Sequence, residues 1–407
     1  MQNHLVIIGN VWPEPSATAA GSRMLQLIDL FKSYNFSITF LTSAKKNEFS
    51  FDLASINIQT RSIELNNNSF NTVITTLNPT AVLFDRFITE EQYGWRVTEN
   101  CPNALKILDT EDLHFLRKAR ENAFKKQRNL IFEDYLSDIF KREIAAIYRC
   151  DLSLIISEYE IDLLTNTFKI DRSLLFYLPF LIDNINKNQP TFSERKHFMS
   201  IGNFLHEPNW QTVLQLKTVW KTIKKELPET ELHIYGAYTS NKVNQLHNEK
   251  EGFLIKGRAN SSKEVYKKYR VLLAPIPFGA GLKGKLFESM QYGLPNITNS
   301  IGAEAMQFNK TWNGFITNNK SQFITKTIQL YTNENIWNKC QNNGYIILEN
   351  KFNTNLFKSK FIEQINYLIN NTKKHRQHNF LGQLFQHHTL QSTKFMSKWI
   401  EVKNSLN

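Results

Sequence analysis

Cysteine is scarce in this chain. Its 407 residues include three cysteines, Cys101, Cys150 and Cys340, which lie far apart and form no C-x-x-C pair. A disulfide framework needs an even and more closely spaced set. We therefore expect three reduced thiols, buried as small hydrophobic side chains, which is typical of a cytoplasmic protein.

Long apolar runs and targeting segments are also missing. The start, MQNHLVIIGN, leads directly into a strand-like run and has no basic region followed by a long apolar stretch, so we expect no signal peptide. No run approaches the roughly 18–20 apolar residues that cross a membrane. We expect a soluble cytoplasmic protein, and peripheral contact with the inner face of the membrane remains open.

Several catalytic and metal-binding signatures are absent as well. The sequence contains no GxxxxGK[ST] phosphate loop, no GxSxG nucleophile elbow and no D-x-D pair. The histidines near the C-terminus, such as His375 and His378, have no cysteine or acidic partner at metal-ligand spacing. We expect no metal ion and no other cofactor.

What the chain does have is a positive balance and enough apolar residues for large cores. It carries 49 Lys and Arg against 37 Asp and Glu, a net charge of +12. Such a balance favours nucleic acid, phosphorylated ligands or an anionic membrane surface as partners. The basic stretch 117–129 lacks interleaved aromatic residues and any nucleic-acid motif, so we expect an exposed helix face near a membrane and no nucleic acid.

Short apolar runs alternate with helical patterns in both halves of the chain. Examples are HLVIIGN, AVLFDRF and LKILDTE in the first half, and HFMSIGNF, ELHIYGA and VLLAPIP in the second. Near-continuous apolar strands that alternate with helices predict a parallel sheet covered on both faces. The sequence therefore predicts an α/β fold with two doubly wound, Rossmann-like domains.

A polar segment, IDNINKNQPTFSERK, separates the two halves. It contains Pro190 and lacks apolar periodicity, which is typical of a linker. The expected organisation is an N-terminal domain at 1–182, a linker at 183–196, a C-terminal domain at 197–355, and helices at 356–407 that return toward the N-terminal domain.

The stretch GAGLKGKLFE, 279–288, follows the strand-like run VLLAPIP and leads into a helix that begins near Lys283. Gly279 and Gly281 expose backbone N–H groups at the carboxyl end of that strand, where open α/β sheets bind ligands. The helix N-terminus adds partial positive charge. Lys283 and Lys285 are unfavourable at a helix start unless an anion lies beside them.

A diphosphate is the natural anion for this place. Glu288, three residues after Lys285, lies on the same helix face and can accept hydrogen bonds from a ribose diol. The pattern indicates a nucleoside-diphosphate clamp. The alternative is a solvated lysine pair on a surface helix, with Glu288 as an ordinary neighbour.

The same stretch resembles the donor-binding domain of GT-B glycosyltransferases, specifically of family 4-like (group 1) enzymes. The resemblance rests on the glycine-rich turn, the two lysines, Glu288-Ser289-Met290 and Gly293-Leu294-Pro295. It implies that Lys283 and Lys285 hold the donor diphosphate and that Glu288 holds the ribose. Ala280 stands where many relatives carry a glutamate, so the donor sugar is not implied.

The resemblance extends to other segments. Gly202 and Asn203 end the first strand of the C-terminal half, where their loop faces the cleft. It implies that the domain at 197–355 binds the donor and that the domain at 1–182 binds the acceptor, across a cleft between them. Retention of anomeric configuration is also implied.

Acceptor-side candidates follow the N-terminal strands. The predicted acceptor-side or cleft residues are Gly21, Arg23, Asp85, Asp109 and Arg117. His114 follows a strand end and can donate to a sugar hydroxyl, so we expect His114, Lys283 and Lys285 to act in catalysis. Ordinary helix caps, solvated charges and a satisfied core histidine remain the alternatives for these residues.

The function expected from these observations is hexosyl transfer from a nucleotide-diphosphate sugar to a saccharide or lipid-linked acceptor in cell-surface glycan synthesis. The alternatives are a catalytically weak nucleotide-sugar or polysaccharide-binding subunit and, in a third class, a basic nucleic-acid-binding protein.

Overall fold

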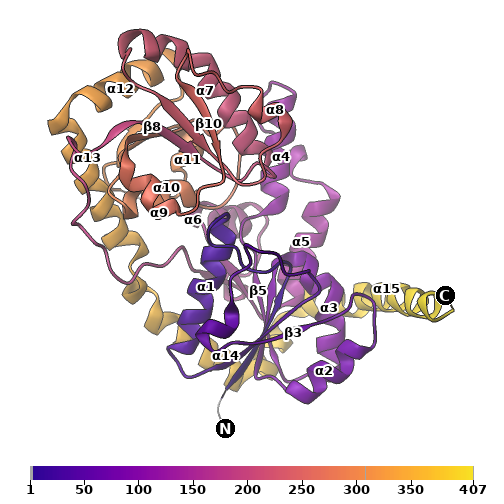
Figure 1. The fold of residues 1–407 in the computed structure, drawn as a ribbon. Helices are drawn as coiled ribbons and strands as arrows, with labels where there is room; N and C mark the ends of the chain where they lie inside the picture. Colours follow the sequence, from indigo (N-terminus) through magenta and orange to yellow (C-terminus); the bar gives the residue numbers. More distant parts are fainter. Residues whose placement is uncertain (1–2, 308, 407) are drawn as a thin grey trace.

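Each half of the chain folds around its own parallel β-sheet, and helices cover both faces of each sheet (Figure 1). The computed structural model describes residues 3–307 and 309–406. The two sheets have seven and six strands, in the orders β3-β2-β1-β4-β5-β6-β7 and β10-β9-β8-β11-β12-β13. Both are doubly wound, because the order reverses beside the first strand of each half. The predicted α/β class with two Rossmann-like domains is confirmed.

The N-terminal sheet is built from near-continuous apolar strands. Its strands are β1 His4–Gly9, β2 Ser37–Thr42, β3 Gln59–Ser62, β4 Ala81–Asp85, β5 Leu105–Asp109, β6 Leu152–Ile155 and β7 Leu175–Tyr177. Val6 and Ile8 of β1 pack into the core on one face of the sheet, whereas Leu5 and Ile7 pack into the core on the other. This two-residue alternation explains why an unbroken apolar run is needed at the centre of the sheet.

Helices of the N-terminal domain begin where the strands end. They are α1 Ala19–Lys32, α2 Ser69–Leu77, α3 Arg86–Asn100, α4 His114–Lys125, α5 Asp138–Arg149 and α6 Glu158–Asp162. Thr18 caps α1, because its side chain accepts a hydrogen bond from the N–H of Gly21 at 3.0 Å. The basic stretch 117–129 lies in α4 as far as Lys125, and its last residues belong to the turn that follows this helix.

The C-terminal domain repeats this arrangement. Its strands are β8 Lys196–Ile201, β9 Leu232–Tyr235, β10 Phe253–Gly257, β11 Tyr269–Ala274, β12 Asn296–Thr298 and β13 Gly314–Ile316. Its helices are α7 Glu207–Glu226, α8 Asn241–Asn244, α9 Ser262–Lys268, α10 Gly284–Gln291, α11 Ser300–Ala303, α12 Lys320–Thr332 and α13 Glu334–Ile347. Lys196, the last residue of the predicted linker, is the first residue of β8.

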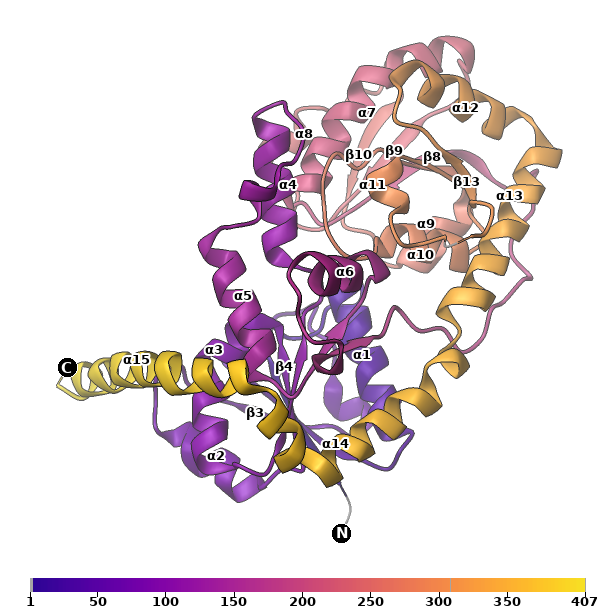
Figure 2. The same cartoon turned by 180° about the vertical axis from the view of Figure 1, so that it is seen from behind.

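The last two helices, α14 Lys358–His378 and α15 Phe380–Ser405, lie against the N-terminal domain, as Figure 2 shows from behind. Phe361, Ile365 and Leu368 of α14 join the same core as Leu5 and Ile7. Their spacing of four and three residues places all three on one face of the helix. The chain therefore crosses between the domains twice. No helix in the described part of the chain is long and apolar enough to cross a membrane.

Candidate functional site

A cavity of about 660 Å³ lies between the two domains. Its walls come from loops that follow β1, β5, β8 and β11, which are the strands at or next to the order reversals of the two sheets. Open α/β sheets bind ligands at such places. The predicted residues that line the cavity are His114, Arg117, Gly202, Asn203, Gly279, Lys283, Lys285 and Glu288.

The loop between β11 and α10 contains three glycines with the spacing G-x-G-x-x-G. Gly281 has a φ of +60°, and a Cβ added there would lie 2.8 Å from the Cβ of Asp112 in the other domain. A Cβ at Gly284 would lie 2.4 Å from the Cβ of Ala19, the first residue of α1. Gly281 and Gly284 therefore let the loop before α10 touch the N-terminal domain, and Gly281 itself does not line the cavity. Gly284 was not predicted.

Lys283 and Lys285 lie at the N-terminus of α10 and line the cavity. The Nζ of Lys283 donates to the backbone oxygens of Ala280 at 3.0 Å and Gly281 at 2.8 Å. The Nζ of Lys285 donates to Oδ1 of Asn209 at 2.8 Å. Burial lowers the pKa of each lysine to about 8. Among the described residues, neither lysine forms an ion pair with a carboxylate, so both are suited to an anion from outside the chain.

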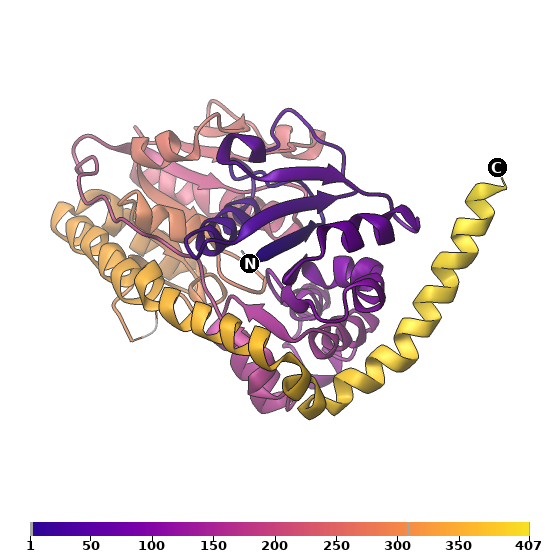
Figure 3. The same cartoon turned by 90° about the horizontal axis from the view of Figure 1, so that it is seen from below.

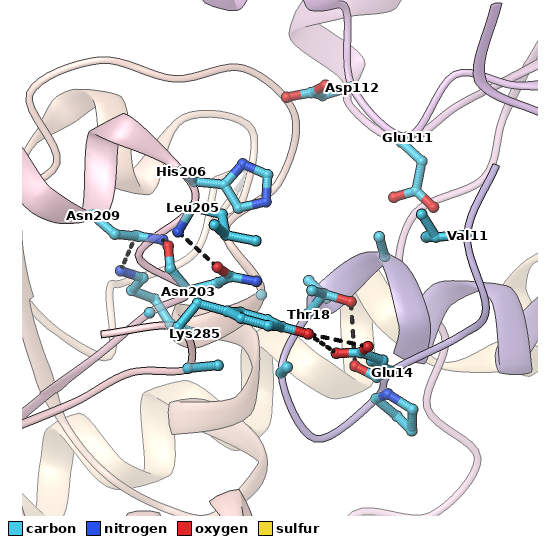
Figure 4. Close-up of a pocket in the computed structure, with 18 of the residues that line it drawn as sticks. Val11, Glu14, Thr18, Glu111, Asp112, Asn203, Leu205, His206, Asn209 and Lys285 are labelled. Atoms are coloured by element: carbon cyan, nitrogen blue, oxygen red, sulfur yellow. Dashed lines mark hydrogen bonds between the residues drawn. The ribbon is translucent and has the colours of Figure 1, made fainter. Parts of the chain in front are cut away.

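Asn209 orients the side chain of Lys285 through this hydrogen bond, and Figure 4 shows the two residues together. It lies in the first turn of α7, and its Nδ2 donates to the backbone oxygen of Asn203 at 2.7 Å. A Cβ at Gly202 would lie 2.5 Å from the side chain of Asn209. Gly202 and Asn203 thus position Asn209, and through it the ammonium group of Lys285.

Glu288 lies one helical turn beyond Lys285. Burial raises the pKa of its carboxyl to about 7, and a hydrogen bond from Tyr266 opposes this rise. Tyr266 is fully buried, and its hydroxyl also lies 3.1 Å from the backbone oxygen of Lys285. The carboxyl group of Glu288 is half-buried and can still accept further hydrogen bonds. It is therefore suited to neutral hydroxyl donors.

His114 and Arg117 line the wall of the cavity that belongs to the N-terminal domain. The Nδ1 of His114 lies 3.1 Å from the backbone oxygen of Asp112 and 3.2 Å from Oε1 of Glu143. Arg117 donates two hydrogen bonds to Asp112, at 2.7 and 2.9 Å. Burial alone would raise the pKa of Asp112, but Arg117 and His114 outweigh this effect and the pKa is lowered. The negative charge of Asp112 is therefore already balanced by Arg117 and His114.

Four residues that were predicted to face the cleft make contacts within the protein and do not line the cavity. Arg23 and Asp109 form a buried ion pair, with side chains only 1% and 0% exposed, in which Arg23 donates to both carboxylate oxygens. Gly21 packs so closely that a Cβ would lie 2.5 Å from the backbone of Glu14. Asp85 accepts a hydrogen bond from the N–H of Asn10 at 2.9 Å. None of these four is among the residues that line the cavity.

Two residues that were not among the predicted site residues lie at the adjacent ends of β4 and β5. Arg86 and Glu111 have φ values of 70° and 63°, and both line the cavity. Non-glycine residues in this left-handed region are uncommon and cluster at functional sites. Burial, followed by the charge of Asp109, raises the pKa of Glu111 to about 8. In Figure 4, Glu111 lies across the cavity from Asn209 and Lys285.

Direct contacts join the domains around the cavity. Glu14 accepts a hydrogen bond from the hydroxyl of Tyr238 at 2.9 Å, which Figure 4 also shows. In the N-terminal domain, Glu160 accepts from the N–H of Gly281 at 2.8 Å and from the N–H of Leu113 at 3.0 Å. Burial raises the pKa of Glu160 to about 8. The structure thus shows the two domains closed on each other.

The described residues include no group of three or more His, Cys, Asp or Glu side chains that could hold a metal ion. The cations that line the cavity near α10 come from the protein itself.

The fold and the interdomain cleft define a GT-B protein. Residues 195–333 match the family described as Glycosyl transferases group 1. The predicted resemblance to GT-B glycosyltransferases of group 1 is confirmed by this match and by the fold. No curated protein matches the chain at a significant level.

Solved structures share the two-domain fold. A glycosyltransferase from Rickettsia africae ESF-5 is 14% identical with a TM-score of 0.65, over 91% of this chain and 99% of that one. The pneumococcal O-GlcNAc transferase GtfA, solved with UDP and GlcNAc, is 14% identical with a TM-score of 0.68, over 90% and 99%. A variant of TarM from S. aureus, in complex with fondaparinux, alpha-GlcNAc-glycerol and UDP, is 16% identical with a TM-score of 0.57. That alignment covers 73% of this chain and 58% of the TarM chain, so this chain spans less than two thirds of that protein.

Proposed function

We propose that the chain transfers a hexosyl-type sugar from a nucleotide-diphosphate sugar to a saccharide or lipid-linked acceptor in cell-surface glycan synthesis. The observation that carries the proposal is the pair Lys283 and Lys285 at the N-terminus of α10, both lining the cavity and neither paired with a described carboxylate. The presence of UDP in the GtfA and TarM structures supports a nucleotide-sugar donor.

The donor site is proposed on the C-terminal domain. A diphosphate beside α10 accepts hydrogen bonds from free N–H groups of the first helical turn and from the two ammonium groups. Glu288, one turn further, accepts from the ribose hydroxyls. The remaining cavity extends toward the N-terminal domain, so the sugar of the donor lies between the domains.

Sugar transfer requires the bond between the anomeric carbon and the diphosphate to break. Negative charge then develops on the leaving phosphate, and Lys283, Lys285 and the helix N–H groups stabilise it. Because these groups supply positive charge at the leaving group, we propose that the reaction proceeds without a metal ion. The family resemblance supports retention of configuration, in which the acceptor attacks from the face of the departing diphosphate.

On the acceptor side, Glu111 and His114 are the proposed contacts. Glu111 lines the cavity, so its carboxyl group is suited to a sugar hydroxyl. His114 is held by the backbone oxygen of Asp112 and by Glu143 through Nδ1, which leaves Nε2 for the acceptor or the donor sugar. Contacts between the domains exclude water from the reacting atoms.

The compartment is proposed to be the cytoplasm. All three cysteines are buried free thiols, which is typical of proteins in a reducing environment.

The proposal is tested by incubating the purified chain with a panel of nucleotide sugars and measuring release of the nucleoside diphosphate. We expect release with at least one donor, undiminished by EDTA. Tight donor binding without any release, with or without candidate saccharide acceptors, would instead identify a nucleotide-sugar-binding subunit. Release that EDTA abolishes would contradict the metal-independent step.

A further inference from the structure

Helix α15 carries an apolar stripe that faces solvent. Phe395, Trp399, Val402 and Leu406 follow one another at spacings of four, three and four residues, which places them on one face of the helix. Each of these side chains is more than half exposed, and Trp399 is 61% exposed. Leu384, eleven residues before Phe395, lies in line with them and is also exposed. Contiguous exposed apolar surface of this kind marks an interaction site.

The opposite face of α15 is fixed to the N-terminal domain. Ser397 is buried and its hydroxyl lies 3.0 Å from Oδ1 of Asn66. Glu401 pairs with Arg96 of α3. Figure 3 shows α15 leaving α14 and running outward beside the N-terminal domain, where it contacts α5 and α3. The stripe is therefore held outward by contacts on the other side of the same helix.

The charges beside the stripe are all positive. Lys398 and Lys403 are exposed and flank the stripe on its two sides in the helical projection, and the Nζ of Lys403 lies 5.4 Å from the centre of the Trp399 ring. Glu401 is the one acidic residue of α15, and Arg96 already neutralises it on the buried side. An outward face with apolar and aromatic residues flanked by lysines fits the interface of an anionic bilayer.

We propose that α15 docks this protein on an anionic lipid surface, with Phe395, Trp399 and Val402 in the headgroup region and Lys398 and Lys403 against lipid phosphates. A second copy of the chain fits less well, because two such helices paired through their stripes would bring lysines together with no outward-facing acidic side chain to balance them. This inference does not depend on the sugar-transfer activity.

The basic stretch 117–129, from which a nearby membrane was expected, is less suited to this role. Its cations are mostly engaged within the protein. Lys118 and Lys125 pair with Glu121, Arg120 pairs with Glu304, and Arg128 pairs with Asp134. The lysines beside the stripe on α15 have no such acidic neighbours on their own face. We therefore place the proposed membrane contact on α15 and not on α4.

The test is co-sedimentation of the full chain with vesicles of phosphatidylcholine alone and of phosphatidylcholine mixed with phosphatidylglycerol. We expect binding to the mixed vesicles that weakens as salt is raised. The variant Phe395→Ser/Trp399→Ser/Val402→Ser should bind at least about tenfold more weakly, because its apolar stripe is lost. Lys398→Gln/Lys403→Gln should weaken binding roughly thirtyfold, because each lysine near an anionic surface contributes about 1 kcal/mol.

Two control variants use exposed apolar residues elsewhere. Tyr367→Ser on α14, where the tyrosine is 56% exposed, and Ile131→Ser/Leu136→Ser beside α4 should bind vesicles as the wild type does. Thermal unfolding should be unchanged in the α15 variants, since the replaced side chains face solvent. Nucleoside-diphosphate binding measured without vesicles should also be unchanged, so failure of docking is distinguishable from failure of the donor site.

The proposal is overturned if the wild type ignores the mixed vesicles, if the α15 triple variant binds them as the wild type does, or if the Ile131/Leu136 variant loses the binding instead. It is also overturned in favour of a second copy if light scattering shows a dimer that the α15 triple variant dissolves and no vesicle binding occurs.

Discussion

Arg120 of the N-terminal domain and Glu304 of the C-terminal domain form an ion pair with two hydrogen bonds, each 2.8 Å long. Arg120 also donates to the backbone oxygen of Gly279 at 2.7 Å. One guanidinium group thus holds both the glycine loop and the segment after α11 against α4. Arg120 therefore contributes three of the hydrogen bonds that join the two domains.

Glu304→Gln should favour an open arrangement of the domains. The ion pair is largely buried, with exposures of 9% and 15% for the two side chains, and removing one charge of a buried pair costs about 3 kcal/mol. We expect a larger radius of gyration by small-angle X-ray scattering and weaker nucleotide binding. Glu91→Gln is the control, because its partner Arg142 is 50% exposed in the same domain. Identical scattering curves for Glu304→Gln and the wild type would contradict the role given to Arg120.

Asp109→Asn should act on stability, since Asp109 belongs to a fully buried pair with Arg23. The substitution leaves the guanidinium group of Arg23 buried with less compensation, which costs about 3–5 kcal/mol. Urea unfolding measures this loss. The control is Asp138→Asn, whose ion pair with Lys141 is 91% and 72% exposed and should contribute less than about 1 kcal/mol. Equal effects of the two substitutions would show that Asp109 is not structural.

Gly281→Ala and Gly279→Ala should differ although the two glycines are two residues apart. Gly281 has a φ of +60°, and an added methyl group would lie 2.8 Å from Asp112, so we expect a loss of about 1–3 kcal/mol of stability. At Gly279 the nearest atom is Cε of the flexible Lys283 side chain at 3.3 Å, and stability should change little. Thermal unfolding of both variants provides the comparison, and a more stable Gly281→Ala variant would contradict the close approach.

Binding of a nucleoside diphosphate should be strongest between about pH 7 and about pH 8. The pKa values of Lys283 and Lys285 are lowered to about 8 by burial, so both lose charge above that pH and attract the diphosphate less. The pKa of Glu288 is raised to about 7 by burial, so it ionises, and accepts ribose hydroxyls better, above that pH.

Titration calorimetry in buffers of different ionisation enthalpy measures this linkage. Above about pH 8 the binding should take up protons, because the diphosphate favours the charged lysines. Glu288→Gln should remove the fall in affinity below about pH 7 and leave the fall above about pH 8. An affinity that is independent of pH from 6 to 9 would contradict the assignment of these three groups.

Much of the fold follows from the sequence because apolar runs determine the buried strands. All residues of β4 and β5 are buried, and their sequences AVLFD and LKILD indicated strands. By contrast, β3 was not predicted, because its residues QTRS are polar and exposed at the sheet edge. The helix α3 begins at Arg86, directly after β4, and this residue turns the chain into the helix with a positive φ.

The residues of the proposed donor site could be grouped from the sequence because they are close together in it. Lys283, Lys285 and Glu288 all lie within one strand-to-helix connection. The acceptor side was less predictable, since Arg23 and Asp109 come from distant elements and pair with each other in the core. Glu111 was overlooked although it lies between Asp109 and Asp112, because only the folded structure shows that Glu111 and Asp112 line the cavity and Asp109 does not.

Lys285 gives the most direct test of the donor site. Titration calorimetry with UDP, the nucleotide present in the GtfA and TarM structures, should show binding to the wild type. Lys285→Ala should weaken it by about 1.5–3 kcal/mol, the usual contribution of a hydrogen bond to a charged group. Lys256→Ala, at an exposed lysine of β10, should leave the affinity unchanged. If UDP and other nucleoside diphosphates do not bind the wild type, or if Lys285→Ala binds as tightly as the wild type, the proposed donor site is contradicted.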